Sequence, residues 1–261
     1  MRAIILAAGQ GTRLAPLTNN SPKCLVELAG ISLLDRQIAV LKERGITDIT
    51  IVAGHCADAI KKGRFRILIN PEYVDTNMVE TLFCARKIME GDEDLIITYG
   101  DIVYERSVLE TLISCDAPVA LAVDHEWRRY WELRMDDPLR DAETLKLDKK
   151  GMVCELGKKP KGYDEIQAQY IGLIKIRADH VLELKKAYLS MDRESTYDGK
   201  DFRNMYMTSF LQYLIDNEWP VRAVQVNNGW LEVDTKADLD LYNRMQQEGT
   251  LKKYYEVNDI Q

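Results

Sequence analysis

Short apolar runs separated by amphipathic segments recur through the first half of the chain. Each run consists mostly of aliphatic residues, as is typical of strands that a parallel sheet buries on both faces. We therefore expect strands at residues 3–8, 49–52, 66–69, 95–98 and 119–123.

The segments between these runs carry helical periodicity. Ser32 can cap a helix in which Leu34, Ile38 and Leu41 share one face, and Gly45 can end it. Two more helices are expected at residues 79–89 and 108–114. This alternation predicts an α/β fold with a mainly parallel sheet, helices on both faces, and ligands beyond the carboxyl ends of the strands.

The second half of the chain does not keep this alternation. The pattern predicts a hairpin of residues 144–148 and 152–156, strands at 170–176, 221–226 and 230–234, and helices at 179–190, 207–217 and 236–247. No internal repeat, low-complexity tract or linker rich in Pro, Gly or Ser interrupts it. One domain over residues 1–261 is therefore favoured over two.

The stretch that follows the first apolar run predicts a cradle for a polyphosphate. Residues 9–13 read Gly-Gln-Gly-Thr-Arg, and alternate glycines let the N–H groups of a tight turn approach a ligand. Arg13 and Lys23 add fixed cations. Leu14 stands where a dinucleotide fingerprint has its third glycine, and the Walker lysine spacing is absent. The alternative is a glycine-rich turn with two solvated cations.

The composition limits the kinds of partner and the cellular location to be expected for the protein. The formal charge of −7 argues against a nucleic acid held by general electrostatics. The five cysteines are widely spaced without a C-x-x-C pair, which favours reduced thiols and a cytoplasmic protein. No apolar run approaches membrane-spanning length, and the first strand leaves no room for a signal peptide.

Two carboxylates follow expected strands at places suited to a metal ion. Asp101 comes just after the strand at 95–98, so its side chain should emerge at the ligand-binding edge, and Asp234 ends the strand at 230–234. Such oxygen pairs suit Mg²⁺, which keeps waters and takes one or two protein carboxylates with substrate phosphates. Glu232, on the same strand face as Asp234, is a weaker third candidate. Without a metal, Asp101 would be a turn residue and Asp234 a helix cap.

The string L-A-A-G-x-G-T-R-L-x-P-L-T followed by P-K resembles the signature of nucleoside-triphosphate transferases that make sugar nucleotides and CDP-activated compounds. The resemblance implies a Rossmann-like fold of the GT-A type, with a nucleotide-binding half over about residues 1–125 and an acceptor-binding half over about 126–261. It also implies that Asp101 and Asp234 hold Mg²⁺.

Within this family the chemistry needs cations more than a base. A phosphate-monoester acceptor has a second pKa of about 6, so at neutral pH it is already an anionic nucleophile. Arg13 is assigned to the pyrophosphate leaving group, and Lys23 to the α-phosphate and the attacking oxygen. The chain has three histidines and neither a serine elbow nor a metalloprotease motif, so triad or zinc hydrolysis has no support.

The resemblance extends to the nucleotide base. Asn70-Pro71, Thr76-Asn77 and Thr81-Leu82 are similar to the base-facing region of the small bacterial cytidylyltransferases, which include enzymes that act on phosphocholine. CTP is therefore the expected nucleotide. The residues expected to contact it are Leu6, Ala7, Ala8, Gly9, Gly11, Thr12, Asn77 and Thr81.

The acceptor side also resembles the family, with one departure. Residues 155–160 are similar to a strand ending in E-K-P whose lysine contacts the acceptor phosphate; Lys159 takes that place, while Lys158 replaces the glutamate and weakens the case for a sugar ring. Stretches around Asp101, at 141–145 and at 204–212 are most similar to the cytidylyltransferases of capsule phosphoramidate synthesis, which act on phosphoglutamine. Phosphoglutamine is thus the first expected acceptor and phosphocholine the second.

Residues 124–134 carry two of the four tryptophans. An aromatic box with acids suits a quaternary ammonium through cation–π contact, whereas an amino acid head needs both signs of charge, as the arginines and acids of residues 128–143 provide. We expect Trp127, Arg134 and Glu143 at the acceptor. The alternative is a surface helix whose Trp127 and Trp131 pack into the core.

Two other functions stay open. A sugar-1-phosphate nucleotidyltransferase using dTTP, UTP or GTP would share the loop and the aspartates, since spacing does not reveal the base. A non-catalytic regulatory nucleotide-binding subunit would share the fold, but such relatives tend to lose the loop arginine, the lysine or the aspartates, which are all present here. Many relatives are dimers or tetramers, so a homodimer is compatible with the resemblance.

Overall fold

A seven-stranded sheet forms the centre of the computed structural model, which describes residues 1–60 and 65–257. All neighbouring strands are parallel except β11, which runs antiparallel to both β6 and β8. The sheet is therefore mixed and mainly parallel, as predicted. In spatial order the strands are β14 (Val221–Val226), β8 (Val119–Asp124), β11 (Gln169–Ile176), β6 (Leu95–Tyr99), β1 (Arg2–Ala7), β4 (Asp48–Ala53) and β5 (Arg66–Ile69).

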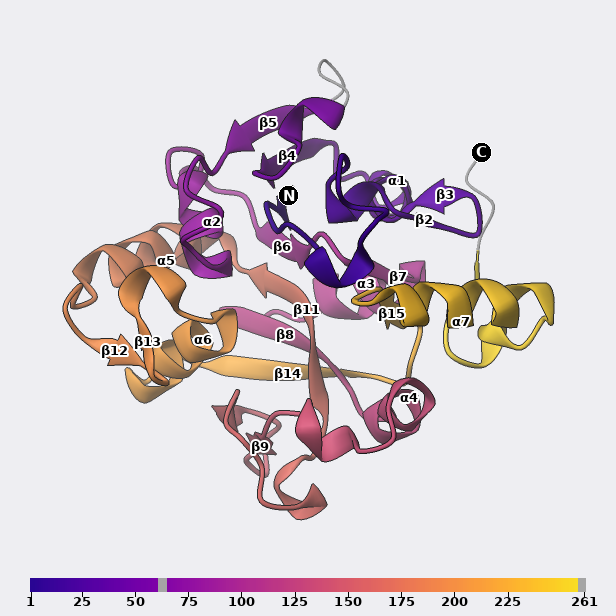
Figure 1. Cartoon of the computed structure of the whole chain (residues 1–261). Coiled ribbons are helices and arrows are strands. Elements are labelled where there is room, and N and C mark those ends of the chain that lie inside the picture. Colours follow the sequence, from indigo (N-terminus) through magenta and orange to yellow (C-terminus); the bar gives the residue numbers. More distant parts are fainter. Residues whose placement is uncertain (61–64, 258–261) are drawn as a thin grey trace.

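Helices cover both faces of this sheet (Figure 1). Alternate residues of β1 enter different cores: Ile5 lies in one, and Ile4 and Leu6 lie in the other. This alternation follows from the period of two along a strand. The Ile5 core includes α1 (Leu33–Glu43), α3 (Arg106–Ile113), α4 (Trp127–Arg134) and α7 (Lys236–Gln247), and the opposite core includes α2 (Met78–Cys84), α5 (Ala178–Ser190) and α6 (Met207–Asp216).

Strand register brings the ligand-binding loops to one edge. Leu6 of β1 pairs with Val52 of β4 and with Tyr99 of β6, so these parallel strands end together. The loop after β1 and the turn after β6 therefore lie at the same edge of the sheet, as predicted for a fold of this kind.

A small antiparallel sheet joins the two halves of the chain beside this edge. It pairs β7 (Ile102–Tyr104) with β15 (Trp230–Glu232), with Glu232 opposite Ile102. The remaining short pairs are β2 (Glu27–Leu28) with β3 (Ile31–Ser32), β9 (Leu145–Leu147) with β10 (Val153–Leu156), and β12 (Thr196–Tyr197) with β13 (Lys200–Asp201). The 3₁₀ turns used below are η1 (Thr12–Leu14), η4 (Pro138–Arg140) and η6 (Phe202–Asn204).

Most predicted elements are present, and two differ in extent. The helix predicted to reach residue 89 ends at Cys84, because the chain beyond it winds into tighter turns that bury Ala85 and Met89. The strand predicted over 230–234 stops at Glu232 and belongs to the small sheet with β7, not to the central sheet. Ser32 caps α1 as predicted, accepting a hydrogen bond from the Asp35 N–H at 3.0 Å.

Two further sequence expectations concern location. All five cysteines are free thiols. Across the described ranges 1–60 and 65–257, we find no helix with the length and apolar character needed to cross a membrane.

Candidate active site

The loop after β1 folds back against Lys23. Gly11 has a φ of 62°, and a Cβ there would lie 3.0 Å from the Lys23 Cβ and 3.2 Å from the Thr18 methyl carbon. Only a glycine tolerates this conformation and this close approach readily. The Gly11 carbonyl also accepts a hydrogen bond from the Thr18 hydroxyl at 2.8 Å. The path of the loop thus requires a glycine at position 11, whereas a Cβ at Gly9 would meet no atom within 4 Å.

Lys23 lies between the two predicted metal-binding carboxylates. Its Nζ is 2.8 Å from Asp101 Oδ2 and 2.8 Å from Asp234 Oδ1. Arg13 forms an ion pair with the other oxygen of Asp234. Burial alone would lower the pKa of Lys23, but Asp101 and Asp234 outweigh it and raise that pKa above the usual lysine value. All four residues predicted for catalysis and metal binding thus form one ion cluster.

Glu232 adds a third carboxylate behind this cluster. Arg134 donates to it at 2.9 Å and to Asp238 at 3.1 Å. Burial raises the pKa of Glu232 above its usual range; Arg134 opposes this rise, and the negative charges of Asp101 and Asp234 add to it. Glu232 is paired with Arg134, whereas Asp101 and Asp234 are paired with Lys23 and Arg13.

Asp234 is not the cap of α7, the alternative role that its position allowed. Thr235 is the N-cap, and it forms a capping box with Asp238. Asp238 also accepts a hydrogen bond from the Asp234 N–H at 3.2 Å. The Asp234 side chain is therefore free of capping and turns toward Lys23 and Arg13.

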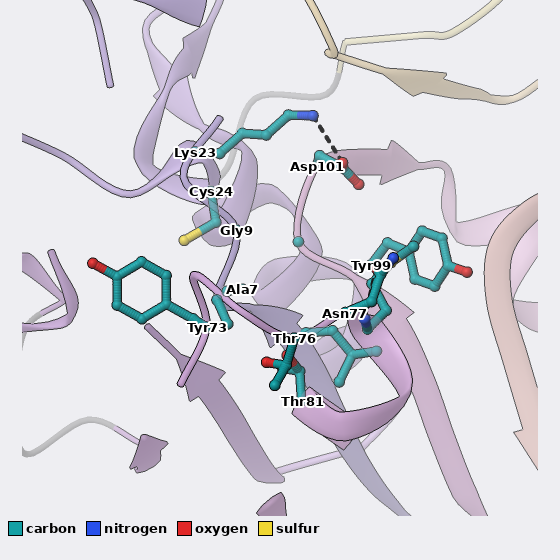
Figure 2. A pocket seen from close by; sticks show the side chains of 14 residues that line it. Ala7, Gly9, Lys23, Cys24, Tyr73, Thr76, Asn77, Thr81, Tyr99 and Asp101 are labelled. Carbon is teal, nitrogen blue, oxygen red and sulfur yellow. Dashed lines mark hydrogen bonds and ion pairs between the residues drawn. The ribbon is translucent and has the colours of Figure 1, made fainter. Parts of the chain in front are cut away.

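A pocket opens beside the cluster, with the Lys23–Asp101 pair at one end and Thr76, Asn77 and Thr81 at the other (Figure 2). Six of the eight residues predicted to contact the nucleotide line it: Leu6, Ala7, Ala8, Gly9, Asn77 and Thr81. Gly11 and Thr12 lie in the loop outside this lining. Thr76, which the resemblance also placed in the base-facing region, lines the pocket with Tyr73 and Cys24, which the sequence pattern did not single out.

Asn77 and Thr81 are held firmly in this pocket. The Asn77 side chain caps α2 by accepting a hydrogen bond from the Met78 N–H at 2.8 Å, and the Asn77 N–H donates to the Arg203 carbonyl at 3.0 Å. The Thr81 hydroxyl accepts a hydrogen bond from the Asn70 amide at 3.0 Å. Segments far apart in the sequence thus fix the wall of the pocket.

A second pocket adjoins the first, because Met78 and Tyr99 line both. Aromatic rings and carboxylates dominate its wall, and Arg13 is its only lysine or arginine among the described residues. Its aromatic residues are Tyr99, Trp131, Tyr170, Tyr206 and Trp230, and its acidic residues are Asp141, Glu143, Glu232 and Asp234. Because Glu232 and Asp234 are already paired with arginine or lysine, Asp141 and Glu143 are the carboxylates of this wall that could face a positively charged group.

Glu143 is the predicted acceptor residue that lines this second pocket. Burial raises its pKa to about 7, and the nearby charge of Asp141 adds to this rise, whereas a hydrogen bond with Thr208 opposes it. Asp141 in turn accepts a hydrogen bond from the Trp131 indole N–H at 2.9 Å. Trp131 and Asp141 are wall residues that were not singled out, although both lie in stretches the sequence had marked.

The other three predicted acceptor residues lie outside that wall. Trp127 is buried in the core, where its ring packs against those of Trp131 and Tyr163, which is the core-packing alternative. The side chain of Arg134 is only 3% exposed and is paired with Glu232 and Asp238. Lys159 Nζ donates to the carbonyls of Leu139 and Arg140 in η4. In this arrangement none of the three lines the second pocket.

Comparisons with known proteins show which sequences the chain is similar to. Residues 3–160 match the family of the MobA-like NTP transferase domain. The chain is 45% identical over 250 residues to the CTP:phosphoglutamine cytidylyltransferase of Campylobacter jejuni, an alignment that covers 92% of this chain and 98% of that one. It is 42% identical over 91 residues to the choline-phosphate cytidylyltransferase of Streptococcus pneumoniae, covering 33% and 40% of the two chains.

Solved structures share the architecture. The inositol-1-phosphate CTP transferase from T. maritima superposes with a TM-score of 0.72 at 17% identity, covering 98% of each chain. The CTP:phosphocholine cytidylyltransferase from Streptococcus pneumoniae gives a TM-score of 0.68 at 23% identity, covering 94% of this chain and 98% of that one. At these identities the likeness establishes the fold, and it confirms the Rossmann-like nucleotidyltransferase architecture predicted from the sequence.

Replacing Arg134 with Met should destabilise the protein strongly. The change leaves the carboxylates of Glu232 and Asp238 without their shared cation, and removing one partner of a buried ion pair typically costs about 3–5 kcal/mol. Chemical denaturation measures the free energy of unfolding. Arg128→Met on the same helix is the control; its pair with Glu132 is exposed on both sides, so a loss below about 1 kcal/mol is expected. Equal losses in the two variants would contradict this account of Arg134.

Proposed function

The chain belongs to the family of the MobA-like NTP transferase domain and is a nucleotidyltransferase, and from this premise we propose that it transfers CMP from CTP to a small phosphorylated acceptor and releases pyrophosphate. Phosphoglutamine is the first acceptor and phosphocholine the second. The observation that carries the proposal is the cluster of Lys23, Arg13, Asp101 and Asp234 at the junction of the pocket that Gly9, Asn77 and Thr81 line and the acidic, aromatic one.

The reaction requires this cluster to align the two substrates and to neutralise their negative charge. An oxygen of the acceptor phosphate attacks the α-phosphorus of CTP and forms a new P–O bond. The bond from the α-phosphorus to the oxygen shared with the β-phosphorus breaks, and its electron pair leaves with pyrophosphate. In this proposal Lys23 contacts the α-phosphate and the attacking oxygen, and Arg13 contacts the departing pyrophosphate. Such fixed cations stabilise the charge of the transition state.

The carboxylates of the cluster fit a magnesium ion. Asp101 Oδ1 is buried and has no hydrogen-bond partner among the described residues, so it can serve as a ligand without losing an existing contact. No group of three or more His, Cys, Asp or Glu side chains in residues 1–60 and 65–257 forms a metal cage. Asp101 and Asp234 would therefore hold Mg²⁺ together with phosphate oxygens and waters, which is its usual coordination. When bound, the ion would neutralise phosphate charge beside the reacting α-phosphorus.

The second pocket supports an acceptor that carries a positively charged nitrogen. Phosphoglutamine has an ammonium group and phosphocholine a quaternary ammonium, and both suit carboxylates beside aromatic rings. A sugar 1-phosphate brings only negative charge to a wall with four carboxylates. The relative aligned over 98% of its own length acts on phosphoglutamine, and for this reason phosphoglutamine stands first.

Three further proposals concern the location, the pathway and the assembly of the enzyme. We propose that the enzyme acts in the cytoplasm, in keeping with its five free cysteines, and that its product serves capsule polysaccharide synthesis. A homodimer stays a prediction. The following experiment must exclude the alternative function of a sugar-1-phosphate nucleotidyltransferase.

Pyrophosphate release from each of four triphosphates with phosphoglutamine, phosphocholine and glucose 1-phosphate tests the proposal. Turnover is expected with CTP, fastest with phosphoglutamine and slower with phosphocholine. Turnover with dTTP, UTP or GTP and glucose 1-phosphate, without turnover with CTP, would overturn the assignment.

Lys23→Met should reduce kcat/KM at least about 100-fold, because it removes a fixed cation from the charge that develops in the transition state. Lys186→Met, a change at an exposed pair on α5, is the control and should keep normal turnover. Circular dichroism checks that both variants are folded. A folded Lys23→Met variant with near-normal kcat/KM would remove Lys23 from the mechanism.

Chelation should abolish turnover, and Asp101→Asn should raise the magnesium concentration needed for half-maximal rate by at least about 10-fold. The reason is that the variant keeps the shape of the side chain while removing its negative charge. Pyrophosphate release during a magnesium titration measures this, with the melting temperature as a check on folding. Wild-type turnover that survives excess EDTA would refute the metal assignment.

Glu143→Gln should raise the acceptor KM about 10-fold while leaving the KM for CTP nearly unchanged, since a hydrogen bond to a charged group is worth about 1.5–3 kcal/mol. The pKa of Glu143 is about 7, so its carboxyl gains charge as pH rises from 6 to 8 and the wild-type KM should fall across that window. The Glu143→Gln variant should lack this part of the pH dependence of the acceptor KM. The acceptor phosphate titrates in both proteins and cancels in the ratio of their KM values, so a ratio independent of pH would count against a charged Glu143.

A further inference from the structure

Gln37 is a polar residue on the apolar face of α1. It is fully buried, and its neighbours on that face are Leu34, Ile38 and Leu41. An amide placed in an apolar core without partners costs free energy, so a leucine would be the simpler choice for packing alone. The contacts of Gln37 therefore show what the amide contributes.

All three hydrogen bonds of the Gln37 side chain are made with residues in and directly beside one turn, that between β6 and β7. The Nε2 group donates to the Tyr99 carbonyl at 2.9 Å and to the Ile102 carbonyl at 2.7 Å. The Oε1 atom accepts a hydrogen bond from the Thr98 hydroxyl at 3.0 Å. Two acceptors on one side and a donor on the other fix which end of the amide is which.

The two carbonyls bracket Gly100 and Asp101, the residues between β6 and β7. Other contacts hold the same turn: the Gly100 N–H donates to the Leu6 carbonyl at 2.8 Å, and the Val233 N–H donates to the Asp101 carbonyl at 2.9 Å. A Cβ at Gly100 would lie 2.7 Å from the Leu6 oxygen, so the turn has little room to move toward β1. Gln37 holds the same turn from α1.

This inference rests on the proposed function. We propose that Gln37 is a positioning residue for Asp101: by holding the carbonyls on both sides of the turn, it keeps the Asp101 carboxylate facing Lys23 and the metal ion that binds there. Gln37 contacts the backbone of the turn and neither Lys23 nor the Asp101 carboxylate, so it acts through the placement of Asp101. Partners of this kind commonly change metal affinity by about 10–100-fold when they are removed.

Gln37→Met tests this, because methionine keeps the length of the side chain and loses both donors and the acceptor. Mn²⁺ binding in the presence of CTP, followed by electron paramagnetic resonance, is expected to weaken at least about 10-fold. The magnesium concentration for half-maximal turnover should rise in parallel. Gln37→Glu, which cannot donate to both carbonyls, is the second variant if Gln37→Met does not fold, and it should shift both values in the same direction.

Leu41→Ala is the matched control, since Leu41 is buried on the same face of α1 and its side chain makes no hydrogen bond. It should lower the melting temperature without weakening Mn²⁺ binding. If Gln37→Met lowers the melting temperature but leaves the Mn²⁺ constant at the wild-type value, Gln37 is a packing residue and the inference is wrong.

The same experiment separates this inference from the proposed function. Wild-type protein that binds Mn²⁺ with CTP but does not turn over phosphoglutamine or phosphocholine would refute the acceptor, while the comparison of Gln37 variants would still decide the role of Gln37. Wild-type protein that binds no Mn²⁺ with any of the four triphosphates would overturn both.

Discussion

The ion pairs of Lys23 with Asp101 and Asp234 are the interaction on which the site depends. They join the loop after β1, the turn after β6 and the end of β15, three segments that are distant in the sequence. Two carboxylates brought this close repel one another unless a cation lies between them, and here Lys23 and Arg13 supply that charge. The groups proposed to handle phosphate and metal are therefore already gathered in the free protein.

The two pockets on either side of this cluster come from different parts of the chain. The nucleotide pocket is built on the carboxyl ends of parallel strands, where the register of β1 with β4 and β6 aligns the loops. The acidic pocket draws most of its wall from later segments, from Trp131 on α4 to Asp234 after β15, and shares Met78 and Tyr99 with the first pocket. Under the proposed function, the alternating half of the fold would hold the nucleotide, and the irregular half would supply most of the wall that faces the acceptor.

Local sequence patterns predicted the frame of the structure and the centre of the site. Apolar runs, the Ser32 cap and the glycine loop depend on neighbouring residues, so they can be recognised without tertiary contacts. Asp101 and Asp234 could be predicted because each follows a strand. Gln37 was not singled out from the sequence, because its role depends on partners across the turn that only the folded chain brings near.

The acceptor wall was harder to predict, because it depends on which side of a helix faces the pocket. Trp127 and Trp131 lie one turn apart, yet only Trp131 lines the pocket while Trp127 packs against Tyr163. Arg134 belonged to a charged stretch that suited an amino acid head, and the fold uses it to neutralise Glu232 and Asp238. These outcomes follow from pairings between distant segments, which spacing along one chain does not encode.

The central claim is that this cluster and its acidic pocket select CTP and a phosphorylated acceptor that carries an ammonium group. The most direct measurement is an internal competition, in which the enzyme and Mg²⁺ meet equal concentrations of four triphosphates together with phosphoglutamine, phosphocholine and glucose 1-phosphate. Mass spectrometry of the products gives the ratios of kcat/KM. The account predicts that CDP-linked glutamine dominates, with CDP-choline second; a nucleoside diphosphate sugar as the main product would contradict it.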